Sequence, residues 1–282
     1  MNILTFDIEE WFHILDNEAT STETHWANFE VRIHQNMDRI HNLLNQTNQK
    51  ATFFCIGWIA RKYPEIIKQI NDNGHEIASH SDMHQLAYKQ SKKAFEDDVE
   101  KSIKHLEDII GKKVISYRAP GFSVKEENKW VFEILMKFGI EIDCSIFPAK
   151  RAHGGFENFG AAVPCWIDVE GMRIKEFPIN LSTFLGKSLI FSGGGYFRLL
   201  PYHIIKRLTK NSDYVMTYFH PRDFDPTQPM VPGLNYIRKL KSYYGLENAL
   251  RKLEKLIKEE HFIDLKTADT QVDWTKAKVL KI

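Results

Sequence analysis

Two histidines four residues apart stand out between residues 77 and 84, in the stretch Ile-Ala-Ser-His-Ser-Asp-Met-His. His80 and His84 follow an apolar run, and the small hydroxyl residue Ser81 lies between them. On a helical turn this spacing places two imidazoles on one face, close enough to share a cation. Alone the pair is a weak signal, because the chain has 12 histidines. With carboxylates nearby it predicts one divalent metal ion, zinc first, with cobalt, nickel or manganese as alternatives.

Carboxylates are available at the other end of the first apolar stretch, Thr-Phe-Asp-Ile-Glu-Glu over residues 5–10. Asp7 and Glu9 are two residues apart, so on an extended backbone both side chains point the same way. One of them can bind a metal while the other takes a proton. The alternative is that Asp7 caps a turn and Glu9 is solvated.

An arginine and a third histidine complete the set of residues that could take part in a reaction. Arg118 follows an apolar stretch and precedes Ala119-Pro120. Its guanidinium fork can hold a carboxylate such as Asp7 bidentately, although a surface ion pair would also explain it. His220 lies between Phe219 and Pro221. Its ordinary pKa suits a general acid near neutral pH, and a structural histidine is the alternative.

These residues must be positioned by apolar strands that alternate with amphipathic helices. Helical periodicity predicts, among others, a helix capped by Ser91 and a helix over 246–259. Strands are expected at 2–7, 51–56, 76–79, 114–117, 140–143, 174–177, 214–219 and 262–265. The alternation predicts an α/β protein, a single-domain distorted (β/α) barrel of about seven strands rather than an open doubly wound sheet.

Active sites of such barrels lie at the carboxyl ends of the strands. The polar residues that fall there are Asp7, His80, His84, Arg118, Asp143 and His220. Composition limits the function further. The net charge of +1 gives no footprint for nucleic acid, and three distant cysteines favour a reducing compartment. Without a signal sequence or a long apolar stretch, we expect no membrane span and a cytoplasmic protein. Nothing in the sequence indicates the oligomeric state.

The order of these motifs resembles the polysaccharide deacetylase family (carbohydrate esterase family 4), over roughly residues 2–225. Five stretches carry the resemblance: Thr5-Phe6-Asp7, the run from His80 to His84, Arg118-Ala119-Pro120, the looser match Asp143-Cys144-Ser145, and the run from Tyr218 to Pro221. The resemblance implies a catalytic domain over 1–282, with a core at about 2–225 and an extension at 226–282 packed on it.

The resemblance also implies a metal-dependent hydrolase that removes an N-acetyl group from an N-acetylated sugar or glycan precursor and releases acetate. Asp7 would be the base and His220 the acid, while His80 and His84 would bind the metal and Arg118 would orient Asp7. Asp143 would join the catalytic residues. Backbone N–H groups near Gly121 and Phe122 would face the oxyanion and the substrate.

The first motif departs from the family pattern, because Ile8 stands where a second, metal-binding aspartate is usual. We expect Glu9 to replace it. This motif, the stretch 193–201 and His-Pro-Arg-Asp at 220–223 resemble a branch associated with exopolysaccharide or O-antigen synthesis. The substrate would then be a nucleotide- or lipid-linked sugar, or a short glycan precursor, that contacts Tyr196 and Arg198; a glycine-rich turn with an ordinary surface arginine is the alternative. Trp11 could supply a face on which a sugar stacks, or pack in the interior. A metal-independent, allantoinase-like amide hydrolase and a non-catalytic carbohydrate-binding barrel are the alternatives.

Overall fold

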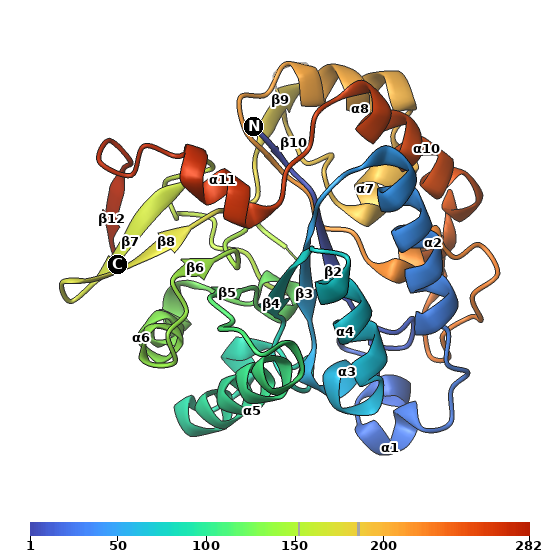
Figure 1. The fold of residues 1–282 in the computed structure, drawn as a ribbon, viewed down its shortest axis with the longest axis horizontal. Coiled ribbons are helices and arrows are strands. Elements are labelled where there is room, and N and C mark those ends of the chain that lie inside the picture. The colour runs from blue at the N-terminus through green and yellow to red at the C-terminus, as the bar shows by residue number, and fades with distance from the viewer. Residues whose placement is uncertain (152, 185–186) are drawn as a thin grey trace.

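Short strands and longer helices alternate along the computed structural model, which describes residues 1–151, 153–184 and 187–282 (Figure 1). The strands are β1 Asn2–Ile3, β2 Thr5–Ile8, β3 Thr52–Cys55, β4 Glu76–Ser79, β5 Ser116–Tyr117, β6 Ile142–Asp143, β7 Cys165–Val169, β8 Met172–Glu176, β9 Ser182–Phe184, β10 Lys187–Leu189, β11 Val215–Met216 and β12 Val279–Lys281. The helices are α1 Glu23–Trp26, α2 Ile33–Thr47, α3 Gly57–Lys62, α4 Pro64–Asp72, α5 Lys92–Ile110, α6 Trp130–Lys137, α7 Gly194–Leu199, α8 Tyr202–Lys210, α9 Tyr236–Tyr243, α10 Leu246–Glu259 and α11 Leu265–Gln271.

The main sheet has eight strands in the order β12-β7-β8-β6-β5-β4-β3-β2, and a two-stranded sheet pairs β1 with β11. From β2 to β6 and on to β8 every pairing is parallel. Beyond β2, single bridges join Phe6 to Phe219 and Gly193 to Tyr218. Within the described ranges no ladder joins this side to β12, so the prediction of a closed or nearly closed barrel is corrected to a mostly parallel open sheet.

The open edge has a local cause. Strands β7 and β8 form an antiparallel hairpin, with Ile167 opposite Ile174, whereas only the second of these strands was predicted. The hairpin reverses the chain direction without a helical crossover, and β12 then pairs parallel to β7 at the edge. The strand predicted at 262–265 is reduced to a bridge between Ile3 and Ile263. The α/β class and the single domain are as predicted.

Helix ends follow the sequence closely where capping residues are present. The Ser91 side chain accepts a hydrogen bond from the N–H of Ala94 at the start of α5. The same helix ends at Gly111, whose φ of 65° is the left-handed conformation that glycine adopts without strain. Helix α10 has the predicted bounds, and its buried stripe includes Leu253 and Leu256.

The end of the chain packs beside its beginning. Helix α10 lies next to α2 and next to the 3₁₀ helix η5, Pro221–Phe224 (Figure 1). Residues 226–282 therefore cover one side of the core and supply the edge strand β12. Among the helices of the described chain, none combines the length and apolarity that crossing a bilayer requires.

The register of the parallel strands decides which residues meet at their carboxyl ends. Asp7 is level with Phe54 in β3, Ser79 with Tyr117, and Phe6 with Phe219. The residues that follow these strands, Glu9, His80, Arg118 and His220, therefore emerge at one edge of the sheet.

Candidate active site

Three side chains from two distant segments converge on one point. The Oε1 atom of Glu9 lies 3.2 Å from Nε2 of His80 and 2.9 Å from Nε2 of His84. One ligand atom from each residue can be chosen so that all lie within 4.8 Å of one another. All three side chains are buried. The structure thus brings together the three residues predicted as metal ligands, with Glu9 in the carboxylate role.

The orientation of the His80 ring is a second observation that fits a divalent metal ion at these three residues. Its Nδ1 lies 2.7 Å from the backbone oxygen of Arg118. Because a carbonyl only accepts, Nδ1 carries the proton, and in the neutral ring Nε2 keeps its lone pair for a metal. A second group that could hold a metal, Asp7, Glu9 and His220, shares Glu9 with the first.

The histidine pair is not on a helix, contrary to the spacing argument. Ser81 and His84 have φ values of 67° and 53°, so the chain from 80 to 84 is a tight irregular turn. The N–H of His84 donates to Oγ of Ser81 at 3.0 Å. Asp98 of α5 accepts the N–H groups of Asp82 and Met83 at 2.7 and 3.0 Å. These contacts, rather than helical periodicity, bring the two rings to 5.3 Å between centroids.

Asp7 is held by Arg118 through one nitrogen. Nη1 of Arg118 donates to Oδ1 of Asp7 at 2.6 Å and to Oγ1 of Thr5 at 2.8 Å. The predicted bidentate contact is therefore corrected to a single-nitrogen contact. The Arg118 side chain is fully buried, and its Cζ lies 4.0 Å from the ring centroid of Phe54. Arg118 thus acts twice, because its side chain fixes Asp7 and its carbonyl fixes His80.

His220 lies across from both carboxylates. Its Nε2 is 3.9 Å from Oδ2 of Asp7 and 3.7 Å from Oε1 of Glu9. Its other nitrogen, Nδ1, lies 3.2 Å from Oδ2 of Asp223, which also accepts the backbone N–H of His220 at 2.9 Å. The side chain is 28 % exposed, so it is the member of this group that solvent reaches most easily.

Charge pairing separates the proton affinities of these groups. Loss of hydration works against charge on all of them, yet Glu9 and Asp223 together raise the pKa of His220 to about 9. Burial would likewise raise the pKa of Asp223, but His220 and Arg198 bring it down to about 2. Against the same burial, the neighbouring His84, His220 and His80 hold the pKa of Glu9 well below its usual value. The site therefore combines ionised carboxylates with a protonated His220.

A cavity of about 480 Å³ lies beside the metal group. His84 belongs both to the metal group and to the wall of this cavity. The loop from His13 to Glu18, together with Trp26 and Lys89, forms other parts of the wall. The turn at Gly121, where φ is 63°, lies against Leu15 of this loop and against Leu86, another wall residue. A small polar molecule in this cavity would therefore be next to His84.

Two residues predicted for the site are engaged elsewhere. The Asp143 carboxyl accepts the N–H and the hydroxyl of Ser145 at 3.0 and 2.6 Å and is hydrogen-bonded to Glu176. It is outside both metal groups, and Asp223 is the carboxylate that contacts His220. Trp11 is 2 % exposed and its Nε1–H donates to the carbonyl of Glu30, so its ring packs in the core instead of facing a sugar.

Of the other residues predicted to contact substrate, Phe122 and Arg198 are engaged by protein groups, and Tyr196 is exposed. The N–H of Phe122 donates to the carbonyl of Ala119 at 3.0 Å, so it is engaged within the turn instead of facing an oxyanion. The Arg198 side chain is buried behind Asp223, which contradicts a direct contact with substrate. Tyr196 on α7 is 43 % exposed, and its predicted contact with substrate stays a prediction.

Asp223 and Asp98 are the residues that sequence reasoning missed. The signal for Asp223 was the spacing in His-Pro-Arg-Asp, because a carboxylate three residues after a cap position often accepts the cap N–H. Asp98 lies on the buried stripe of α5, between the apolar Phe95 and Val99. A charged residue at a buried helical position indicates a specific partner, here the histidine turn.

Comparisons with known proteins give different matches for the two halves of the chain. Residues 17–141 match the family model of polysaccharide deacetylases, and residues 144–269 match a domain of unknown function, DUF3473. A peptidoglycan-N-acetylglucosamine deacetylase of Bacillus cereus is 34 % identical over 103 residues, 36 % of this chain and 46 % of that protein. A peptidoglycan deacetylase of Helicobacter pylori is 31 % identical over 108 residues, 38 % of this chain and 36 % of that protein. The matched region thus covers less than half of each relative.

Solved structures show the same fold over the whole chain. A candidate polysaccharide deacetylase from Mycobacterium smegmatis superposes with a TM-score of 0.67 at 18 % identity, covering 99 % of this chain and 92 % of that one. A carbohydrate esterase family 4 pseudoenzyme from Bacillus anthracis superposes with a TM-score of 0.50 at 13 % identity, covering 99 % and 66 %. Because the second is described as a pseudoenzyme, the fold alone does not decide catalysis, and the site residues must.

Proposed function

We propose that this protein is a metal-dependent hydrolase that removes an N-acetyl group from an N-acetylated sugar and releases acetate. The observation that carries the proposal is the convergence of Glu9, His80 and His84 beside an aspartate held by Arg118. The named activity of the curated relatives, deacetylation of N-acetylglucosamine in peptidoglycan, supports the reaction class.

In this reaction Asp7 is the general base. Arg118 keeps its carboxylate in place, so Oδ2, the oxygen nearer His220, is available to take a proton from the attacking water. The water oxygen forms the new bond to the acetyl carbon, and the bond from this carbon to the sugar nitrogen breaks. His220 gives a proton to the departing amine. Its raised pKa, about 9, favours the protonated form that this step requires.

Glu9, His80 and His84 are the residues that would hold the metal. When bound, a divalent ion would supply Lewis acidity towards the acetamide carbonyl and the attacking water. Two imidazoles and one carboxylate are a common zinc donor set with open positions, so we propose zinc, with cobalt, nickel or manganese as substitutes. The position of Glu9 also supports this proposal over a metal-independent amide hydrolase, which the absence of a second aspartate had suggested.

For the substrate, we propose an N-acetylated sugar or short glycan precursor, nucleotide- or lipid-linked, from exopolysaccharide or O-antigen synthesis. The support is the sequence pattern of residues 6–12, 193–201 and 220–223, whereas the curated relatives carry peptidoglycan in their names. The cavity beside His84 is large enough for about one or two sugar rings. The cytoplasmic location expected from the sequence stays a prediction.

The test measures acetate and free amine released from three probes: UDP-N-acetylglucosamine, an N-acetylglucosamine oligosaccharide and a peptidoglycan fragment. Zinc-loaded protein should release both products from at least one probe, and prolonged chelation should abolish release. Full activity after verified metal removal would favour the metal-independent alternative. Absence of acetate from all three, together with tight glycan binding, would favour a non-catalytic carbohydrate-binding protein.

A further inference from the structure

We propose that Arg198 is a positioning residue that ties Asp223, and through it the His220 imidazole, to the C-terminal end of helix α9. The role in catalysis rests on the proposed function, because it assumes that His220 donates a proton to the leaving amine. The structural part of the proposal stands on contacts that are independent of any reaction.

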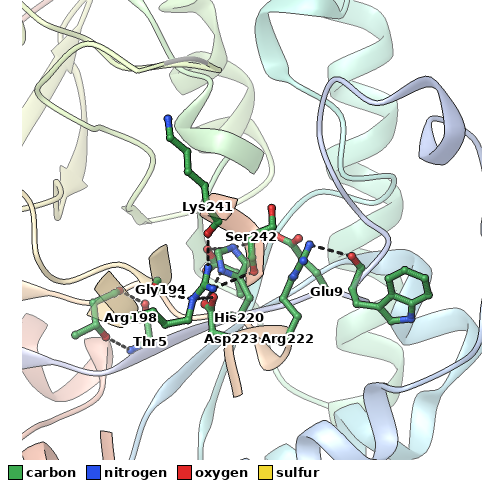
Figure 2. A network of polar contacts seen from close by, with 12 residues as sticks. Thr5, Glu9, Gly194, Arg198, His220, Arg222, Asp223, Lys241 and Ser242 are labelled. Atoms are coloured by element: carbon green, nitrogen blue, oxygen red, sulfur yellow. Dashed lines mark hydrogen bonds and ion pairs between the residues drawn. The ribbon is translucent and has the colours of Figure 1, made fainter. Parts of the chain in front are cut away.

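The Arg198 guanidinium donates four hydrogen bonds to backbone carbonyls. Nη1 donates to the carbonyls of Ser242 and Tyr244, both at 2.9 Å, and Nη2 donates to the carbonyl of Lys241 at 3.0 Å. Nε donates to the carbonyl of Gly194 at 3.2 Å. Figure 2 shows Arg198 close to Gly194, Lys241 and Ser242 and to the pair Asp223 and His220. The side chain is only 6 % exposed, so it is not placed to bind a sugar.

The same guanidinium forms an ion pair with the carboxylate that contacts His220. Nε of Arg198 is 3.2 Å from Oδ1 of Asp223, and the other oxygen, Oδ2, faces Nδ1 and the backbone N–H of His220. The two oxygens of Asp223 therefore have different partners: Oδ1 contacts Arg198 and Oδ2 contacts His220. Arg198 restrains one oxygen, which leaves the second aimed at the imidazole.

Two glycines make room for this arrangement. A Cβ on Gly194 would lie 1.9 Å from Oδ2 of Asp223, and one on Gly193 would lie 1.8 Å from the Tyr218 ring. The glycine-rich stretch at the start of α7 is thus required by close approach of its backbone to Asp223 and Tyr218. Arg198, one turn later on the same helix, reaches the carboxylate because α7 starts so near it.

Helix α9 lies at the other end of this series of contacts. None of its residues is buried, so polar contacts, including those with Arg198, hold it in place. The carbonyls at a helix C-terminus carry partial negative charge and attract a cation. At the end of α9 this cation is Arg198, which donates to the carbonyls of Ser242 and Lys241. The neighbouring turn at Gly245 lies against the backbone of Arg198.

Loss of the guanidinium should therefore free Asp223 and let the His220 ring rotate, without changing the metal ligands. We expect Arg198→Met to lower kcat about 10- to 100-fold, with KM within about twofold and zinc affinity unchanged. Arg198→Lys should recover part of kcat, because an ammonium can neutralise Asp223 but cannot serve all the carbonyls. Gly194→Ala displaces Asp223 from the other side and should also lower kcat.

Lys252→Met is the matched control. Lys252 donates to the carbonyls of Phe197, Arg198 and Leu200 at 2.9, 3.0 and 2.9 Å, so it anchors the same segment without touching Asp223. If Arg198 only stabilises the fold, Lys252→Met and Arg198→Met should lower stability to a similar extent and should have the same kcat. A loss of kcat confined to Arg198→Met and Gly194→Ala, with partial recovery in Arg198→Lys, supports the proposal.

A measurement without turnover separates this proposal from the proposed function. In protein labelled with ¹⁵N-histidine, the Nδ1–H proton of His220 should give a slowly exchanging signal in the wild type and in Lys252→Met. It should be lost or broadened in Arg198→Met, or in Gly194→Ala if the first variant does not fold. Absence of acetate release by the wild type would refute the proposed function alone. An unchanged Nδ1–H signal, or a kcat equal to that of Lys252→Met, would overturn the role of Arg198.

Discussion

Glu9 is the residue on which the two parts of the site meet. Its Oε1 faces the imidazoles of His80 and His84, which we propose as metal ligands, and is also 3.7 Å from Nε2 of His220. In the polysaccharide deacetylase family that the sequence resembles, a metal-binding aspartate is usual one residue earlier, where this chain has the buried Ile8. Glu9, two residues after Asp7, reaches His80 and His84, because alternate residues of a strand share a side.

Replacing Glu9 by Ala should weaken zinc binding by at least about 100-fold, because the only carboxylate of the Glu9, His80 and His84 group is lost. Isothermal titration of the metal-free protein with zinc measures this directly. Glu18→Ala, an exposed change nearby, is the control and should leave the affinity unchanged. Equal zinc affinity in Glu9→Ala and wild type would show that the metal is held elsewhere.

Replacing Asp7 by Asn should separate catalysis from metal binding. The variant loses the proton acceptor but keeps Glu9, His80 and His84, so we expect kcat to fall by about 10²- to 10⁴-fold. Zinc affinity in the same titration should stay close to the wild-type value. Retained activity in a variant with normal metal content would exclude Asp7 as the base.

Residue types at the strand ends were predictable, and so was the contact of Arg118 with Asp7. The residues behind His220 were not. Asp7, His80, Arg118 and His220 each follow an apolar stretch, a pattern visible in sequence. The contact of Asp223 with His220, in contrast, depends on the turn η5 and on Arg198 behind it. Asp143 was expected in the site from its position at a strand end, whereas its carboxyl is hydrogen-bonded to Ser145 and Glu176; its catalytic role stays a prediction.

Elements with clear end signals were predicted well. Helices α5 and α10 begin and end where capping residues and periodicity placed them. The hairpin of β7 and β8 was missed in part, since β7 gives only a short apolar pattern that does not specify its direction. The histidine turn was predicted with the wrong conformation, because the contacts with Asp98 that shape it come from a distant helix.

The junction between α4 and β4 contains a buried histidine with a consequence for stability. His75 is 6 % exposed, and within the described residues neither ring nitrogen has a hydrogen-bond partner. Burial, with smaller effects of Lys50 and His41, lowers the pKa of His75 from 6.5 to about 4. Between these two values the unfolded chain binds a proton that the folded protein does not.

Stability should therefore fall as the pH drops below 6.5, and His75→Gln should reduce this fall. Between pH 7.5 and pH 5 the contribution of His75 amounts to about 2 kcal/mol of unfolding free energy. Urea unfolding of the metal-free protein at both pH values measures the difference for wild type and variant. His34→Gln, at an exposed position, is the control. A pH dependence identical in wild type and His75→Gln would contradict the assigned shift.

At the scale of the whole molecule, the site lies where β2, at the edge of the main sheet, meets the segment 218–220. The single bridge between Phe6 and Phe219 brings His220 opposite Asp7, and residues 144–269 supply His220, Asp223 and Arg198. The region that matches polysaccharide deacetylases contains His80, His84 and Arg118. Neither matched region alone contains the complete set of candidate catalytic residues.

Metal should consequently stabilise the whole chain. Of the three proposed ligands, Glu9 is 71 residues from His80 and 75 from His84 in sequence, so the unfolded chain does not hold them together. Zinc at 100 times its Kd should raise the unfolding free energy by about 2.7 kcal/mol, which a thermal shift assay detects. Glu9→Ala should show little shift under the same conditions. A wild-type Tm that does not respond to zinc, cobalt, nickel or manganese would contradict this prediction.

The most direct test of the proposed site is anomalous diffraction at the zinc edge from crystals of the zinc-loaded protein. We predict one strong peak at about 2.0–2.2 Å from a carboxylate oxygen of Glu9 and from Nε2 of both His80 and His84. Asp7 should remain on Arg118 beside the ion. A peak at another position, or none between these three side chains at full zinc occupancy in solution, would contradict the proposed metal centre.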